Sequence, residues 1–254
     1  MNLRSAFIRL QCPPQVFAVI TLATTCAAVL CLTSTSLTQG IAKSVYLINV
    51  QSAAITHVVP QIRYTGAYPT APLTDATAAP FNVTVAVHML SPQGSTGTLT
   101  ITGSWGTRTP IRIPVTLPAS SDDTLVNVPL GLTSPGAVSL WWPLGLGSQT
   151  LYTVEASWTP STGGGSVASS RSLGFRSIYL VTANDTDPST LAGRTGSDSF
   201  TMRLKVNGAD MYARGANMIP MDEFEGRQSA EAYSQLMISA TDAHFNTLRV
   251  WGGG

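Results

Sequence analysis

Short runs of alternating apolar and polar residues fill the chain from about residue 44 to residue 181. In such runs every second side chain faces the same side, as in a strand with one buried face. Turn-forming Pro, Gly, Ser and Asp residues separate the runs. The clearest runs are 82–88, 98–102, 111–117, 124–130, 151–158 and 167–178. Roughly six to eight short strands at this spacing predict an antiparallel β-sandwich of the immunoglobulin type.

A polar stretch rich in Asp, Thr, Ser and Gly at 183–199 predicts a linker. Two further strands are predicted beyond it, at Phe200–Val206 and Ala209–Ala213, on either side of Asn207-Gly208. Asn-Gly between two apolar runs is the strongest short-range signal for a β-hairpin.

Helical periodicity replaces strand alternation near residue 230. Ser229 is a suitable N-cap, and the apolar positions Tyr233, Leu236, Met237 and Ala240 follow it at helical spacing. Alternation returns at Asn246–Trp251. There Leu248 and Val250 are predicted on one face, and Thr247, Arg249 and Trp251 on the other. Strand, helix and strand in this order predict a β-α-β unit, the beginning of an α/β domain.

The composition argues against several kinds of site and partner. Beyond residue 37 the chain carries 12 basic and 13 acidic side chains, so it is nearly neutral and gives no electrostatic footprint for nucleic acid. All three cysteines lie within the first 31 residues, so no thiolate site is expected in the body. His57, His88 and His244 are far apart in sequence, and we therefore expect no metal site and no cofactor.

The N-terminal segment, residues 1–37, has three interpretations. Arg4 and Arg9 precede an uncharged run at 16–32 that is rich in Ala, Val, Leu and Thr. This pattern is typical of a signal peptide or signal anchor. The run is also near the lower length limit of a membrane-spanning helix. The third possibility is sequence wrongly joined to the gene product. Two glycosylation sequons, at Asn82 and Asn184, matter only in a secretory protein.

Four motifs together resemble one enzyme family. They are Thr38–Leu47, Leu140-Trp-Trp-Pro-Leu-Gly to Tyr152, Gly174-Phe-Arg-Ser-Ile-Tyr-Leu, and the pair Gly-Ala-Asn-Met-Ile-Pro (215–220) and Asn-Thr-Leu-Arg-Val-Trp-Gly-Gly-Gly (246–254). In this order they resemble the β-mannosidases of glycoside hydrolase family two, retaining enzymes that cleave terminal β-linked mannose. The resemblance implies β-mannoside glycans as partners and the lysosome or secretory pathway as location.

The resemblance also implies a division of the chain. Residues 38–48 would be the remnant of a jelly-roll sugar-binding domain and 49–182 the immunoglobulin-like sandwich. Residues 200–254 would be the first β-α-β unit of an incomplete (β/α)₈ TIM barrel. The fold class is then mainly β. The alternative interpretation is a non-enzymatic β-sandwich binding module behind a membrane anchor.

The family uses two catalytic glutamates, and neither is expected in this chain. Its acid/base glutamate follows an asparagine, and no Asn-Glu pair occurs here. We therefore expect no catalytic residue and an inactive chain. The resemblance instead assigns substrate-binding roles to Arg249, Trp251 and Asn217. Arg249 would hold the nucleophile carboxylate, Trp251 would form an apolar wall under the sugar, and Asn217 would line the same opening from a position just past the first strand.

Overall fold

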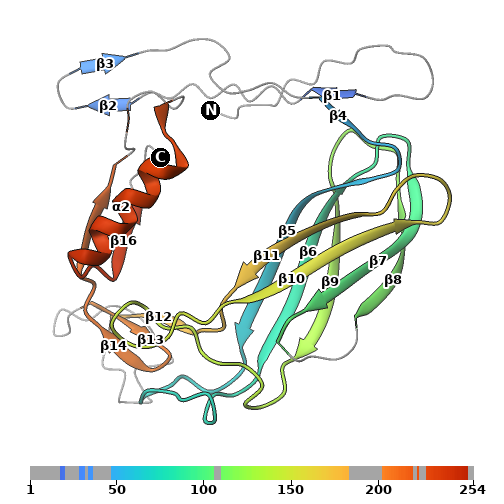
Figure 1. Cartoon of the computed structure of the whole chain (residues 1–254). Helices are drawn as coiled ribbons and strands as arrows, with labels where there is room; N and C mark the ends of the chain where they lie inside the picture. The colour runs from blue at the N-terminus through green and yellow to red at the C-terminus, as the bar shows by residue number, and fades with distance from the viewer. Residues whose placement is uncertain are drawn as a thin grey trace. The chain divides into compact units, whose positions relative to one another are not determined.

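The computed structural model describes residues 18–20, 29–31, 34–36, 47–105, 110–182, 202–219, 222 and 227–250. The chain divides into two compact units. One is Ser52–Ala213, and the other combines Met1–Gln51 with Arg214–Gly254. Figure 1 shows the elements of both units, which are described in turn.

The larger unit contains two antiparallel sheets, as the alternating runs predict (Figure 1). In the three-stranded sheet the order is β5-β6-β9, and in the four-stranded sheet it is β11-β10-β7-β8. The strands are β5 Ala54–Tyr64, β6 Phe81–Leu90, β7 Ser95–Gly103, β8 Ile111–Leu117, β9 Thr124–Leu132, β10 Tyr152–Pro160 and β11 Val167–Leu173.

A single apolar core lies between these two sheets. Side chains on one face of β6 are fully buried, among them Phe81, Val83 and Val85. They belong to the same cluster as Leu99 of β7 and Trp158 of β10. Each fully buried side chain of this kind stabilises the fold by about 1.5–3 kcal/mol. The unit is therefore a two-layered sandwich with its own core.

A small third sheet, β12-β13-β14, belongs to the same unit. It consists of β12 Ile178–Val181, β13 Arg203–Val206 and β14 Ala209–Met211. Asn207 and Gly208 join β13 to β14 with φ angles of 48° and 79°. Positive φ at both central residues is the requirement of a type I′ hairpin turn. The predicted Asn-Gly hairpin is thus confirmed, and it pairs with β12 of the larger unit.

The run at 167–178 is wrong as a single strand. β11 ends at Leu173, and β12 begins at Ile178. Between them Phe175 is fully buried and forms an isolated bridge with Leu140. A Cβ atom at Gly174 would lie 2.9 Å from Trp141 Cβ, so the chain passes too close to Trp141 for a side chain at this position. The alternation continues through this break because Phe175 is buried in the same core.

The smaller unit contains one parallel β-α-β unit. Its elements are β15 Gly215–Met218, α2 Ala230–Asp242 and β16 Thr247–Val250, and β15 pairs in parallel with β16. Ser229 caps α2 as predicted, because its side chain accepts a hydrogen bond from the Ala232 backbone N–H. The remaining strands are β1 Ala18–Ile20, β2 Val29–Cys31, β3 Ser34–Ser36 and β4 Leu47–Asn49.

In the described part of the chain, no helix has the length and apolar character needed to cross a membrane. Most of the predicted membrane segment 16–32 lies outside the described residues. The parts that are described, 18–20 and 29–31, are short strands.

Gly215 is essential to the parallel pair. A Cβ atom placed on Gly215 would collide with the backbone carbonyl oxygen of Thr247, the residue opposite it in β16. We expect Gly215→Ala to separate β15 from β16 at this end and to increase amide hydrogen exchange at Ala216 and Leu248.

The control substitution must be at a glycine that can accept a side chain. Gly131→Ala is not a suitable control because Gly131 has a positive φ. Gly165→Ala is suitable because a Cβ there meets nothing within 4 Å. Equal exchange in Gly215→Ala and the unaltered chain would disprove the close approach.

Candidate functional site

The candidate site lies on one face of the parallel pair β15–β16. Asn217 and Arg249 occupy directly opposite positions in the register. Side chains opposite each other in adjacent strands point to the same face of a sheet. The Nη1 atom of Arg249 donates a hydrogen bond of 3.0 Å to Oδ1 of Asn217, and both side chains are exposed. Two residues that are 32 positions apart in the sequence thus form one polar contact.

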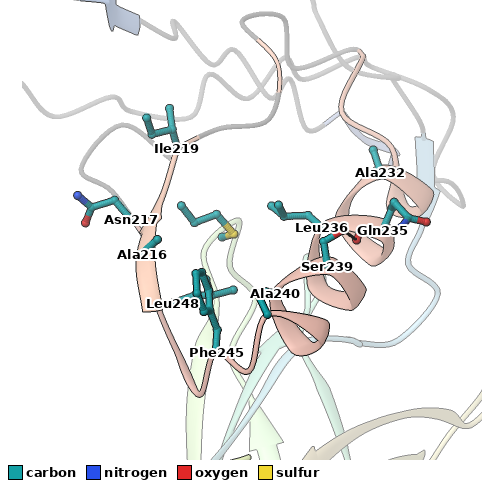
Figure 2. Close-up of a pocket in the computed structure, with 12 residues that line it drawn as sticks. Ala216, Asn217, Ile219, Ala232, Gln235, Leu236, Ser239, Ala240, Phe245 and Leu248 are labelled. Atoms are coloured by element: carbon teal, nitrogen blue, oxygen red, sulfur yellow. Dashed lines mark hydrogen bonds between the residues drawn. The ribbon is translucent and has the colours of Figure 1, made fainter. Parts of the chain in front are cut away.

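The opposite face of the same strands turns toward α2. A cavity of about 710 Å³ lies between them and is lined mostly by apolar side chains, including Leu248, Leu236 and Phe245. Figure 2 shows Leu236 and Ala240 of α2 on one side of this space, while Asn217 points to the other side of its strand, away from α2. The strands therefore present a mostly apolar face to α2, and Asn217, which also contributes to the lining of the cavity, directs its side chain to the other face.

The helix covers its side of the strands loosely. None of the residues of α2 is buried, and Tyr233 and Met237 are each more than a third exposed. Leu236 and Ala240, two of the four predicted apolar positions, line the cavity. Half of the predicted amphipathic face is thus oriented toward the strands, with space remaining between the two layers.

The chemistry of the Asn217–Arg249 pair follows from its donors. A guanidinium carries five N–H donors in a planar fork that matches a carboxylate. Within the described residues one of these donors bonds to Asn217. The amide oxygen of Asn217 holds the guanidinium by one edge, so its other donors can bind a carboxylate or sugar hydroxyls. The pair can therefore position an anion.

Residues between β15 and α2 hold the start of the helix. Arg227 forms an ion pair with Asp222 at 2.6 Å, and the Gln228 amide donates to the Asp222 backbone carbonyl. Tyr233 in turn donates to the Gln228 side chain. Asp222 therefore has a structural role in the connection between β15 and α2.

Glu231 lies in the first turn of α2. Hydrogen bonds from its own backbone N–H and from the Ser229 side chain lower the pKa of its carboxyl below 4.5. The ionised form is therefore the form that the folded helix favours. Its stabilising contribution is fully present above about pH 4.5 and is lost as the pH falls through the lower folded-state pKa.

The structure brings two of the three predicted site residues together. Asn217 and Arg249 meet, but Asn217 is inside β15 and not just past it, because its backbone pairs with that of Arg249. Trp251 lies outside the described residues. Of the four glutamates, Glu155 is exposed on β10 in the sandwich, Glu231 is on α2, and the other two lie outside the described residues.

The tryptophan pair Trp141–Trp142 packs in the sandwich unit. Trp142 is half-buried against the main core cluster. The guanidinium carbon of Arg176 lies 4.5 Å from the Trp141 ring centroid, a cation–π contact. We therefore interpret both tryptophan rings as packing residues of the sandwich.

Comparison with known proteins shows which enzymes the chain is similar to. No family model matches the chain. β-Mannosidase from Rattus norvegicus is 36% identical over 117 residues, which cover 46% of this chain and 12% of the relative. β-Mannosidase A from Aspergillus niger is 39% identical over 132 residues, covering 52% of this chain and 13% of the relative.

A solved structure of a β-mannosidase also matches the chain. The crystal structure of β-D-mannosidase from Dictyoglomus thermophilum matches with a TM-score of 0.59 and 25% identity, covering 85% of this chain and 23% of that chain. The chain is a relative of the β-mannosidases. This β-mannosidase relative spans about an eighth of the length of the two curated enzymes it matches.

Proposed function

We propose that this β-mannosidase relative provides an immunoglobulin-like sandwich and the first β-α-β unit of a (β/α)₈ barrel in a retaining glycosidase for terminal β-mannosides. Parallel strands joined by a helix are the repeating unit of such a barrel. The observation that carries the proposal is the Asn217–Arg249 hydrogen bond on one face of β15–β16, in a chain similar to enzymes named β-mannosidases.

The proposed role of Arg249 is electrostatic. Retaining glycosidases need one carboxylate as nucleophile and another as acid/base. A guanidinium bonded to the nucleophile lowers its pKa and keeps it ionised. Asn217 accepts one donor of Arg249 and so fixes the orientation of the guanidinium. Trp251 would follow Arg249 on the same face and provide an apolar wall for the sugar ring.

The chain by itself should not catalyse the reaction. Glu155 is in the sandwich, and Glu231 is bonded within the first turn of α2. No Asn-Glu pair occurs in the sequence to provide the family's acid/base residue. The proposed contribution of this chain is therefore to hold the site, and the two catalytic carboxylates would be provided by sequence that it does not contain.

We expect no hydrolysis of p-nitrophenyl β-D-mannoside by this chain. Removing an essential triad or dyad member lowers catalysis by several orders of magnitude, and here both carboxylates are lacking. Release of p-nitrophenol would be followed at 400 nm against a blank without protein. Release above the blank that co-purifies with the chain, and disappears in an Arg249→Gln variant, would contradict the assignment of the catalytic pair.

A chimera tests the proposed positive role. Residues 52–254 would replace their structural counterpart in the Dictyoglomus thermophilum β-D-mannosidase, whose structure covers 85% of this chain. The host then supplies the remaining barrel. If 52–254 act as proposed, the chimera hydrolyses β-mannosides. If the sandwich is instead a non-enzymatic binding module, a folded chimera has no activity.

The proposed location is the lysosome or the secretory pathway. Of the two sequons, Asn82 is exposed on β6, and its side chain is therefore accessible to glycosylation. Asn184 lies outside the described residues. An exposed glycosylation acceptor at Asn82 is compatible with the proposed secretory route.

A further inference from the structure

Two of the three histidines of this chain are direct neighbours in the sandwich. His57 of β5 pairs with His88 of β6 in the antiparallel register. Their ring centroids are 5.7 Å apart, and the rings are nearly perpendicular at 83°. His57 is exposed and His88 is half-buried, so the pair opens to solvent. The third histidine, His244, belongs to the other unit.

A bulge in β5 creates this pairing. The register shifts between Ile55 and His57, which leaves Thr56 as an extra residue. The Thr56 hydroxyl donates its one hydrogen to the Asp123 carboxylate at 2.7 Å, and the carbonyl oxygen of His88 lies 3.2 Å from the same hydroxyl oxygen. Bulges re-aim side chains, and these contacts hold the bulge in place. They also bring a negative charge next to the residue that precedes His57.

The spacing of the two rings suits a shared metal ion. Metal–nitrogen bonds of about 2.0–2.1 Å place the centroids of two imidazoles on one ion roughly 4.5–6.5 Å apart, depending on the angle at the metal. The observed 5.7 Å lies within this range. The backbones of both residues are fixed by the β5–β6 ladder. In a shared site one nitrogen of each ring faces a common point, which requires rotation of the side chains but no movement of the paired backbones.

We propose that His57 and His88 form a two-imidazole binding site for a divalent transition-metal ion, with water completing the coordination. Imidazole is a ligand for Zn²⁺, Ni²⁺ and Cu²⁺, and affinity rises to a maximum at Cu²⁺. No cluster of three or more metal-ligating side chains occurs among the described residues. The site thus has two protein ligands, and Cu²⁺ is the ion that should bind it most tightly. This proposal does not depend on the glycosidase proposal.

The test is a Cu²⁺ titration of the full, untagged chain by isothermal titration calorimetry. Cys12, Cys26 and Cys31 are alkylated first because thiolates bind soft metal ions. We expect one ion per chain, and an electron paramagnetic resonance spectrum that shows coordination by two imidazole nitrogens. His57→Gln and His88→Gln should each weaken binding about tenfold or more, because a single imidazole ligand remains. His244→Gln is the matched control and should leave the affinity unchanged.

The outcomes separate the proposal from a simple ring contact. Because His57 is exposed, His57→Gln should fold like the unaltered chain, which its thermal unfolding midpoint checks. Unchanged Cu²⁺ affinity in His57→Gln would overturn the proposal, whatever the behaviour of His88→Gln. Loss of binding in His244→Gln would overturn it as well, because the ion would then be bound in the other unit.

Discussion

Replacing Arg249 by Gln in the chimera with the Dictyoglomus thermophilum enzyme is expected to lower kcat/KM for a β-mannoside by about 10²–10³-fold, the usual effect of removing one preorganised donor to a developing charge. Gln keeps a polar side chain that can still bond to Asn217, but it has no positive charge and no planar fork. The nucleophile carboxylate would then lose the contact that we propose keeps it ionised. Steady-state hydrolysis of p-nitrophenyl β-D-mannoside measures the effect.

The pH profile distinguishes this role from a structural one. Without the guanidinium, the pKa of the nucleophile carboxyl rises, because a neighbouring positive charge no longer favours its ionised form. The acidic limb of the kcat/KM profile should therefore move to higher pH in Arg249→Gln. Arg249→Lys restores the charge but not the fork, so it should recover the pH profile more fully than the rate.

Arg112→Gln is the matched control, because Arg112 is also an exposed strand arginine but lies on β8 of the sandwich. It should leave kcat/KM and the pH profile unchanged. Equal kcat/KM values in Arg249→Gln and Arg112→Gln would contradict the assignment of Arg249 to the sugar site.

The largest expected effect on stability is that of Asn207→Ala. Asn207 is fully buried and joins three segments of the sandwich unit. Its side chain accepts a hydrogen bond from the Ser177 backbone N–H and donates one to the Trp141 carbonyl, each at 2.9 Å. Its backbone donates to Ser177 and accepts from Leu73. The side chain of Asn207 thus satisfies backbone groups on two different loops.

Alanine at position 207 leaves the Ser177 N–H and the Trp141 carbonyl without this partner. Each unsatisfied buried group costs about 1–3 kcal/mol, and Asn also tolerates the positive φ of this turn better than Ala. We expect the free energy of unfolding to fall by about 3–6 kcal/mol, a large part of the roughly 5–15 kcal/mol typical of a domain. Urea denaturation monitored by tryptophan fluorescence measures the change.

Asn127→Ala is the control for this substitution because Asn127 is exposed on β9. It should alter the free energy of unfolding by less than about 0.5 kcal/mol. Asn207→Asp should also be strongly destabilising, because it keeps the acceptor for Ser177 but puts a carboxylate in a fully buried position beside the Trp141 carbonyl. A loss below about 1 kcal/mol in Asn207→Ala would show that these bonds do not hold the loops together.

Local signals in the sequence predict the strands and turns well. The alternation at 82–88 marks β6 because that strand buries one complete face in the core. Asn207-Gly208 predicts its hairpin because only a few residues accept positive φ in sequence. Strand β5 gives a weaker signal. It contains Pro60, which a strand tolerates at the edge of a sheet, and β5 is an edge strand.

Contacts between residues that are distant in the sequence cannot be predicted from these local signals. The contact between Arg249 and Asn217 depends on the register of two parallel strands, which the helix between them does not specify. The resemblance to β-mannosidases implies that both residues lie near one opening, but not that they bond to each other. His57 and His88 meet only because a bulge at Thr56 shifts the register, and no pattern of apolar residues reveals such a bulge.

The most direct test of the account is the kcat/KM of the chimera that retains Arg249 and Asn217. If residues 52–254 form the sandwich and the first β-α-β unit of a β-mannosidase, the chimera should hydrolyse p-nitrophenyl β-D-mannoside well above the blank, with a loss of up to about 10²-fold relative to the Dictyoglomus enzyme, because a misplacement of about 1 Å at the new junction can cost that much. A chimera that has the unfolding midpoint of the host but hydrolyses the substrate no faster than the blank would contradict the account.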